Sequence, residues 1–268
     1  MRYILLICIL LYPLTVSGFD TDFSKEEKVV MTNIAGLAAV TAWGVANWNY
    51  FGNSPSRANE GWFSENTKEG GADKLAHFYL SYTLSHALGS LYENWGYSHR
   101  KGALLGSWSS FGIMSLMEIG DSFSSYGFSS EDFIMNCIGS IAGYFLYTSP
   151  ELSRKIDFRV EYIPNFDSVD FFTDYEHSKY LMALKLDGFD CVKKKYLKYL
   201  ELHVGYYTRG YSNGIDKKRN IYVGVGINLS KIFNDLSMKK ISKIANYIQL
   251  PYTYISIKKN LNTYSIQP

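Results

Sequence analysis

Three clusters of polar residues interrupt otherwise apolar, helix-like segments, and they constrain this chain more than any other feature. Within each cluster the residues are three or four positions apart, which places them on one face of a helix. A carboxylate or imidazole that faces an apolar interior costs several kcal/mol unless it is paired, ligated or neutralised. Three such clusters on successive helices therefore predict one shared polar centre inside a small bundle. The clusters are Asp73-Lys74-x-x-His77, Glu118-x-x-Asp121 and Asp132-x-x-x-Asn136.

Residues 1–18 have the pattern of a secretory signal peptide. A basic start precedes the apolar run Ile4–Leu14, and small residues then lead to Gly18, after which we expect cleavage. The alternative is an uncleaved membrane anchor. Cys8 follows Leu-Leu-Ile as a lipoprotein cysteine would, but it lies too close to the N-terminus to leave a normal signal ahead of it. The sequence therefore predicts export without lipidation.

The overall composition excludes some classes of partner and leaves others open. A net charge of +2 favours no nucleic-acid partner. The 23 tyrosines and 16 phenylalanines suit a membrane interface, a β-rich envelope protein or an ordinary core. Cys137 and Cys191 remain after cleavage, and neither has the spacing of a metal site. We expect two free thiols.

The chain reads as helical before about residue 155. These segments are ambiguous between membrane helices and a buried soluble bundle, and we favour the membrane because Gly102–Gly120 is nearly uncharged over a bilayer's length. Gly139-x-x-x-Gly143 would allow close helix packing. Asp73 is the expected cap of the second helix and Ser130 that of the fourth. The expected helices are Val29–Tyr50, Asp73–Trp95, Lys101–Asp121 and Ser130–Tyr147.

The pattern changes to alternating strands beyond residue 155. Three strands are predicted, and Asn213-Gly214 supports a hairpin between the last two. Leu236–Ile248 is expected to form a basic amphipathic helix, and an extended tail begins at Leu250. Because so few strands cannot close into a barrel, a small antiparallel sheet that packs on the bundle or on a membrane surface is the simpler prediction. The expected strands are Tyr180–Leu186, Leu200–Tyr207 and Asn220–Leu229.

Two physical accounts of the polar centre remain open beside simple ligand recognition. In one, the residues form a closed hydrogen-bonded network that fixes the helix packing. In the other, they bind a divalent cation or act as an acid/base pair, since mixed nitrogen and oxygen ligands suit zinc, manganese or iron. The candidate catalytic residues are His77, Glu118, Asp121 and Asp132, and the structural polar residues are Asp73, Lys74, Asn136 and Ser129.

The same motifs carry a resemblance to a known family. Residues 71–78 (GADKLAHF), 118–121 (EIGD) and 127–139 (GFSSEDFIMNCIG) resemble the YfiM-like domain-of-unknown-function family of predicted envelope lipoproteins. Residues 174–181 (DYEHSKYL) and 202–206 (LHVGY) resemble, more loosely, the longer members of that family. The resemblance implies an envelope location and a shared polar centre. It brings no established reaction.

A weaker similarity reaches the VanZ-like membrane proteins. They share the DK-x-x-H start and the D-x-x-x-N-x-x-G end on adjacent helices. This chain departs from them at Glu118 and Asp121, where those proteins usually carry a Glu followed by Gln. The similarity implies a VanZ-like helical bundle.

These observations predict an α+β protein of the cell envelope, exported to the periplasm or associated with a membrane, the outer membrane included. We expect a signal peptide at 1–18, a four-helix YfiM-like bundle with a polar centre at 19–155, and a small antiparallel sheet with a terminal helix at 156–268. The leading hypothesis is a non-enzymatic or uncharacterised protein whose partner is a membrane lipid or envelope component. The alternatives are a hydrolase of a lipid-linked or cell-wall precursor and a barrel-like outer-membrane protein. No cofactor is implied beyond a divalent cation.

Overall fold

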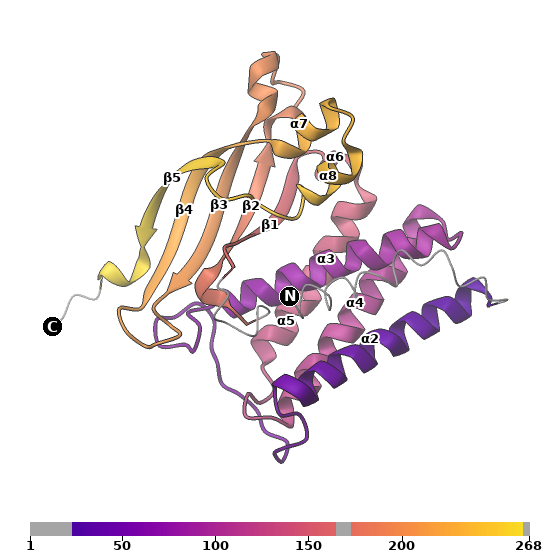
Figure 1. Cartoon of the computed structure of the whole chain (residues 1–268), viewed down its shortest axis with the longest axis vertical. Coiled ribbons are helices and arrows are strands. Elements are labelled where there is room, and N and C mark those ends of the chain that lie inside the picture. The colour runs from indigo at the N-terminus through magenta and orange to yellow at the C-terminus, as the bar shows by residue number, and fades with distance from the viewer. Residues whose placement is uncertain (1–22, 165–172, 265–268) are drawn as a thin grey trace.

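The protein is α+β in the computed structural model, which describes residues 23–164 and 173–264 (Figure 1). The predicted signal peptide and Cys8 lie outside these residues. Four long helices match the predicted ones to within a few residues at each end, and a short helix follows them. The helices are α2 (Lys25–Asn47), α3 (Ala72–Asn94), α4 (His99–Ser122), α5 (Ser130–Thr148) and α6 (Pro150–Ser153).

Helix α2 begins four residues earlier than predicted because its first turn forms a capping box. The Ser24 side chain accepts a hydrogen bond from the Glu27 backbone N–H, and the Glu27 carboxylate accepts one from the Ser24 N–H. This reciprocal pair satisfies two of the free donors at a helix start. Residues 25–28, which precede the predicted helix start at Val29, therefore form its first turn.

Two predicted caps are wrong. Helix α3 is preceded by Gly71 in a left-handed conformation with φ of 88°, and the Asp73 carboxylate makes no cap hydrogen bond. Helix α5 is capped by Ser129 rather than Ser130, since Ser129 Oγ accepts from the Asp132 backbone N–H at 3.2 Å. The Asp73 side chain is thereby left for another partner.

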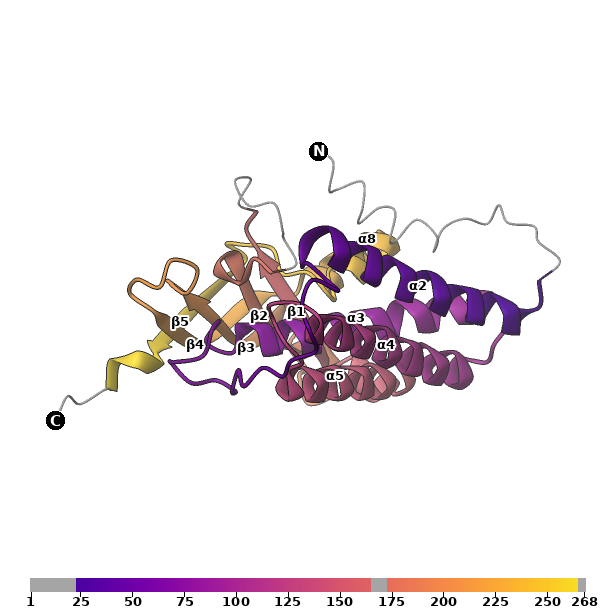
Figure 2. The ribbon, with the colours of Figure 1, turned by 90° about the horizontal axis from the view of Figure 1, so that it is seen from below.

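Helix α3 is the central element of the molecule. It packs against α4 and α5 on one side and contacts the sheet on the other, as two orthogonal views show (Figures 1 and 2). The Phe158 ring of the sheet meets Phe78 and Tyr82 edge-to-face at 4.8 and 5.5 Å between centroids. A core of buried side chains fills the contact of α3 with α2 and α4: Leu88, Leu91, Tyr92, Tyr97 and Ile113.

The sheet contains five strands in antiparallel order β1-β2-β3-β4-β5, so two strands were missed. Charged residues occupy every second position of β1, which disguises it as a solvent-exposed segment. The edge strand β5 lies in the tail that we expected to be merely extended. The strands are β1 (Ile156–Tyr162), β2 (Ser178–Lys185), β3 (Leu200–Arg209), β4 (Lys218–Ile227) and β5 (Tyr254–Asn260).

The predicted amphipathic helix over Leu236–Ile248 is also wrong. The structure has two short helices instead, α7 (Leu229–Asp235) and α8 (Lys239–Ile244). Ser237 between them has φ of 62°, a left-handed conformation that cannot continue a right-handed helix. The last long element within the described residues is therefore strand β5 and not a helix.

Among the described residues, α2 alone is long and apolar enough to cross a membrane by its length and composition. Only 6% of its most apolar window is buried in the protein. The four-helix bundle that we favoured as membrane-embedded thus contains one helix that meets this criterion. Three hydrophobic side chains near its start, Val30, Met31 and Ile34, are exposed.

The α3–α5 contact yields a prediction about glycine. A Cβ at Gly139 would collide with the Phe78 backbone carbonyl, whereas one at Gly112 in α4 would meet nothing. We expect Gly139→Ala to lower the free energy of unfolding by about 1–3 kcal/mol through overpacking. Gly112→Ala should raise it by roughly 0.5–1 kcal/mol because alanine favours the helix. Thermal unfolding of both variants tests this, and equal shifts would contradict it.

Candidate functional site

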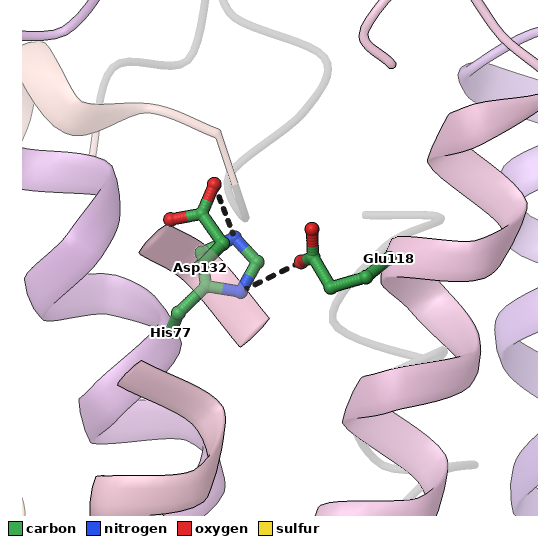
Figure 3. Close-up of side chains that lie close together, drawn as sticks. All are labelled: His77, Glu118 and Asp132. Carbon is green, nitrogen blue, oxygen red and sulfur yellow. Dashed lines mark ion pairs between the residues drawn. The ribbon is translucent and has the colours of Figure 1, made fainter. Parts of the chain in front are cut away.

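The three predicted clusters meet at one end of the helical bundle. The first turns of α3 supply Lys74 and His77, the last turns of α4 supply Glu118, and the first turns of α5 supply Asp132 and Asn136. Figure 3 shows the His77 ring between the carboxylates of Glu118 and Asp132. The start of α3, the end of α4 and the start of α5 lie side by side, so residues 77, 118 and 132 are neighbours.

Lys74 is the most tightly enclosed charge of this centre. Its ammonium lies 2.5 Å from Glu60, 2.7 Å from Asp73 and 3.0 Å from Asp132, and only 1% of its side chain is exposed. Burial alone would lower the pKa of Lys74, but the Asp73 and Asp132 carboxylates raise it above its ordinary value. Lys74 is therefore a permanent cation held by three acids.

Hydrogen bonds around Asn136 fix the orientation of the His77 ring. The Asn136 side-chain N–H donates to the Met114 carbonyl at 3.3 Å, and Ser81 Oγ donates to Asn136 Oδ1 at 3.0 Å. The amide oxygen therefore faces His77 Nδ1 at 3.2 Å and can only accept. Nδ1 carries the proton, and Nε2 points toward Asp132 Oδ2 at 4.0 Å.

Burial shifts three acids of the centre toward their protonated forms. It raises the pKa of Glu118 to about 8 and that of Asp121 to about 6, and it also raises the pKa of Asp132. Burial opposes protonation of His77, yet the Asp132 and Glu118 carboxylates raise its pKa above the ordinary value. Burial therefore favours the neutral forms of these acids, whereas their carboxylates favour the protonated form of His77.

Two carboxylate oxygens at the ring lack a hydrogen-bond partner among the described residues. Glu118 Oε1 lies 3.2 Å from His77 Nδ1, but that nitrogen is aligned with Asn136 instead, and Asp132 Oδ1 is also unpaired. A buried acceptor without a donor is costly. The arrangement therefore has unused capacity to bind a proton or a cation.

Two groups of side chains in the described ranges have metal-ligand geometry. Ligand atoms of His77, Glu118 and Asp132 all lie within 4.8 Å of one another. Those of Glu60, Asp73 and Asp132 do so as well, but the Lys74 ammonium already lies among them. The first group is therefore the one that could hold a divalent ion.

The remaining residues predicted for the site have distinct places. Asp121 lies one turn beyond Glu118 and outside the His77 group; burial raises its pKa, and the neighbouring Tyr50 hydroxyl partly offsets that rise. Ser129 caps α5 and lies 3.5 Å from the Lys74 ammonium. Gly139 and Gly143 pack against α3 at Phe78 and Ser85.

Sequence reasoning missed two residues of the centre. Glu60 lies between α2 and α3, in a segment without helical or strand periodicity. Tyr50 lies just beyond the end of α2, although the sequence predicted it as the last residue of that helix. Tyr50 donates a hydrogen bond to the Met117 carbonyl at 3.0 Å, and Glu60 contacts Lys74. The sequence contains no signal that points to either residue, because the predicted centre already held more acids than bases.

Residues 59–148 match the sequence model of a family described as "Predicted periplasmic lipoprotein (DUF2279)". The match extends from just before Glu60 to the end of α5 and so contains every residue of the centre except Tyr50. It supports an envelope family of unknown function and an exported protein of the cell envelope. No curated protein and no solved structure shows significant similarity to this chain.

Replacing Lys74 tests the ion-pair cluster. Lys74→Met should lower the free energy of unfolding by about 3–5 kcal/mol, because it leaves three acids without their buried cation. Urea unfolding gives the measurement. Lys218→Met, at an exposed pair with Asp216, is the matched control and should change stability by about 0.5 kcal/mol or less. Similar small losses in both variants would contradict the role of Lys74.

The pKa of Glu118 predicts how stability depends on pH in metal-free protein. Because folding raises this pKa from 4.5 to about 8, its favourable contribution is complete below pH 4.5 and is lost as pH rises to about 8. Glu118→Gln should remove much of that decline, on the order of a few kcal/mol. Urea unfolding at a series of pH values with a chelator measures it.

The exposed Glu65→Gln variant should keep the wild-type slope. A slope that Glu118→Gln leaves unchanged would show that another group is responsible.

Proposed function

We propose that this chain is an exported, membrane-associated envelope protein whose buried centre binds a divalent cation through His77, Glu118 and Asp132. The observation that carries the proposal is the meeting of three ligand atoms, from three different helices, within 4.8 Å. From the sequence motifs, we also propose that the chain is related to YfiM-like and VanZ-like proteins.

The orientation of His77 supports this role. A ligating histidine usually donates its second ring N–H to an acceptor that fixes the tautomer. Asn136 Oδ1 is that acceptor for Nδ1, which leaves the Nε2 lone pair directed toward Asp132. The carboxylates of Glu118 and Asp132 lie on either side of the ring, and each has an unpaired oxygen that adds acceptor capacity.

The charge of the centre favours a cation as well. Its basic members are Lys74 and His77, and five acids surround them: Glu60, Asp73, Glu118, Asp121 and Asp132. A buried surplus of negative charge must be offset by protons or by an ion. One imidazole and two carboxylates suit zinc, manganese or iron more than calcium. Three protein ligands leave a position for water or substrate.

A second candidate is a hydrolase of a lipid-linked or cell-wall precursor that uses acid/base catalysis without a metal. It is favoured by Glu118, whose pKa of about 8 lies near that of a general acid at neutral pH. His77 beside it would serve as the partner base. In this case the acid surplus is offset by protons instead of an ion.

Elemental analysis of purified full-length protein decides between the two. We expect about one equivalent of a transition metal, lost in His77→Ala because the nitrogen ligand is removed. His99→Ala is the matched control, since His99 is exposed and lies at the other end of α3 and α4, and it should retain the metal. Protein that folds normally but takes up no Zn²⁺ or Mn²⁺ would overturn cation binding.

A further inference from the structure

The two faces of the sheet have opposite chemistry. On one face, Arg159 and Glu201 form a bidentate ion pair at 2.7 and 2.9 Å, extended by Asp157 and Gln249. Arg159 is 2% exposed and Glu201 is 0% exposed. The charged face of this sheet is therefore the enclosed one, and it satisfies most of its own hydrogen bonds.

The other face is an almost unbroken apolar lattice. Strand register aligns its side chains in rows that run across all five strands. The charged side chains on this face, Arg219 of β4 and Lys259 of β5, both lie at one corner, beside Ile221. The rows are Ile156-Leu184-Leu202-Val225-Ile255, Phe158-Met182-Val204-Val223-Ile257 and Val160-Tyr180-Tyr206-Ile221-Lys259.

Only part of this lattice is covered. Helix α3 packs on the β1–β2 end, where Phe158 meets Phe78 and Tyr82. The β3–β5 end is open, and Ile255 and Ile257 on the edge strand are each 81% exposed. Its other exposed members are Leu202, Val204, Ile221, Val223 and Val225. In a sheet that faces water, charged side chains are usually exposed and aliphatic ones buried. This sheet has the opposite arrangement.

We propose that the open β3–β5 end of this apolar face rests on the acyl chains of an anionic lipid layer. This deepens the membrane association of the proposed function and does not depend on the cation site. Charge complementarity supports it: residues 179–268 contain 16 Lys and Arg but 5 Asp and Glu, in a chain whose net charge is +2. Basic protein surfaces beside apolar ones bind anionic membranes.

A second copy of the chain fits the observations less well. Protein interfaces concentrate Tyr, Trp and Arg, but the open end of the lattice is made of Val, Ile and Leu. A single dimer contact would also leave other exposed apolar surfaces in water. These are the start of α2 and a stripe along α5: Ile134, Ile138, Ile141 and Phe145.

The depth of contact is limited by strand β5. Its outer edge has no neighbouring strand among the described residues, and unpaired backbone groups are not tolerated in the hydrocarbon core. The sheet should therefore lie at the boundary of headgroups and acyl chains, at a depth of about 5–10 Å. Lys258 on the opposite face and the corner Lys259 could then reach headgroups or water.

Adjacent residues of β5 provide a matched test, since Ile257 and Ser256 are both exposed but lie on opposite faces. Ile257→Cys and Ser256→Cys are made in the full-length protein with Cys8, Cys137 and Cys191 replaced by serine, and each is labelled with bimane. The proteins are bound to phosphatidylglycerol/phosphatidylethanolamine vesicles. Quenching by acyl-brominated lipid is compared with quenching by aqueous iodide.

We expect brominated lipid to remove at least half of the fluorescence at position 257 and little at 256, with iodide giving the reverse. Equal access of iodide to both positions, with no effect of brominated lipid, would overturn the proposal. Protection of 257 from both quenchers in a dimeric protein would assign the face to a second copy and overturn it too. Undiminished quenching in pure phosphatidylcholine would refute the anionic preference. Metal content tests the cation site separately.

Discussion

The burial of one ammonium group organises the helical end of this protein. Lys74 pairs with Glu60, Asp73 and Asp132, so it ties the loop before α3 to α3 itself and to the start of α5. A buried cation of this kind is tolerable only if all its partners are in place, since removing one leaves an uncompensated charge. The close approach of α5 to α3 at Gly139 brings the acids within reach. The geometry of His77 depends on the same approach.

The centre and the sheet solve the problem of buried charge in different ways. In the sheet, Arg159 and Lys185 are paired with Glu201 and Asp157, so the two signs cancel. In the helical centre, acids outnumber bases, and burial raises the pKa of Glu118 to about 8. Structural networks tend toward the first arrangement. A surplus that must be met by protons or by an ion is typical of sites that bind or react.

The residues of the centre could be predicted because polar side chains at helical spacing within apolar segments are costly to bury unless they meet partners. His77, Glu118 and Asp132 do meet. Pairing could not be predicted: Asp73 looked like a helix cap and instead binds Lys74, and Asp121 lies outside the His77 group. Glu60 could not be predicted because an acid in an irregular loop carries no periodic signal. Strand β1 was missed because charges at alternate positions imitate a solvent-exposed segment, although here they face inward.

The amino-acid sequence by itself determined the four helices, the central strands and most of the polar residues of the centre. These features depend on local periodicity, and the whole periodic pattern of an element lies within its own stretch of sequence. Only the tertiary structure decided which acids surround Lys74, which nitrogen of His77 is free and which face of the sheet is left open. Those depend on the register between segments distant in sequence: the apolar rows exist only because Ile257 lies beside Val223, and Val223 beside Val204.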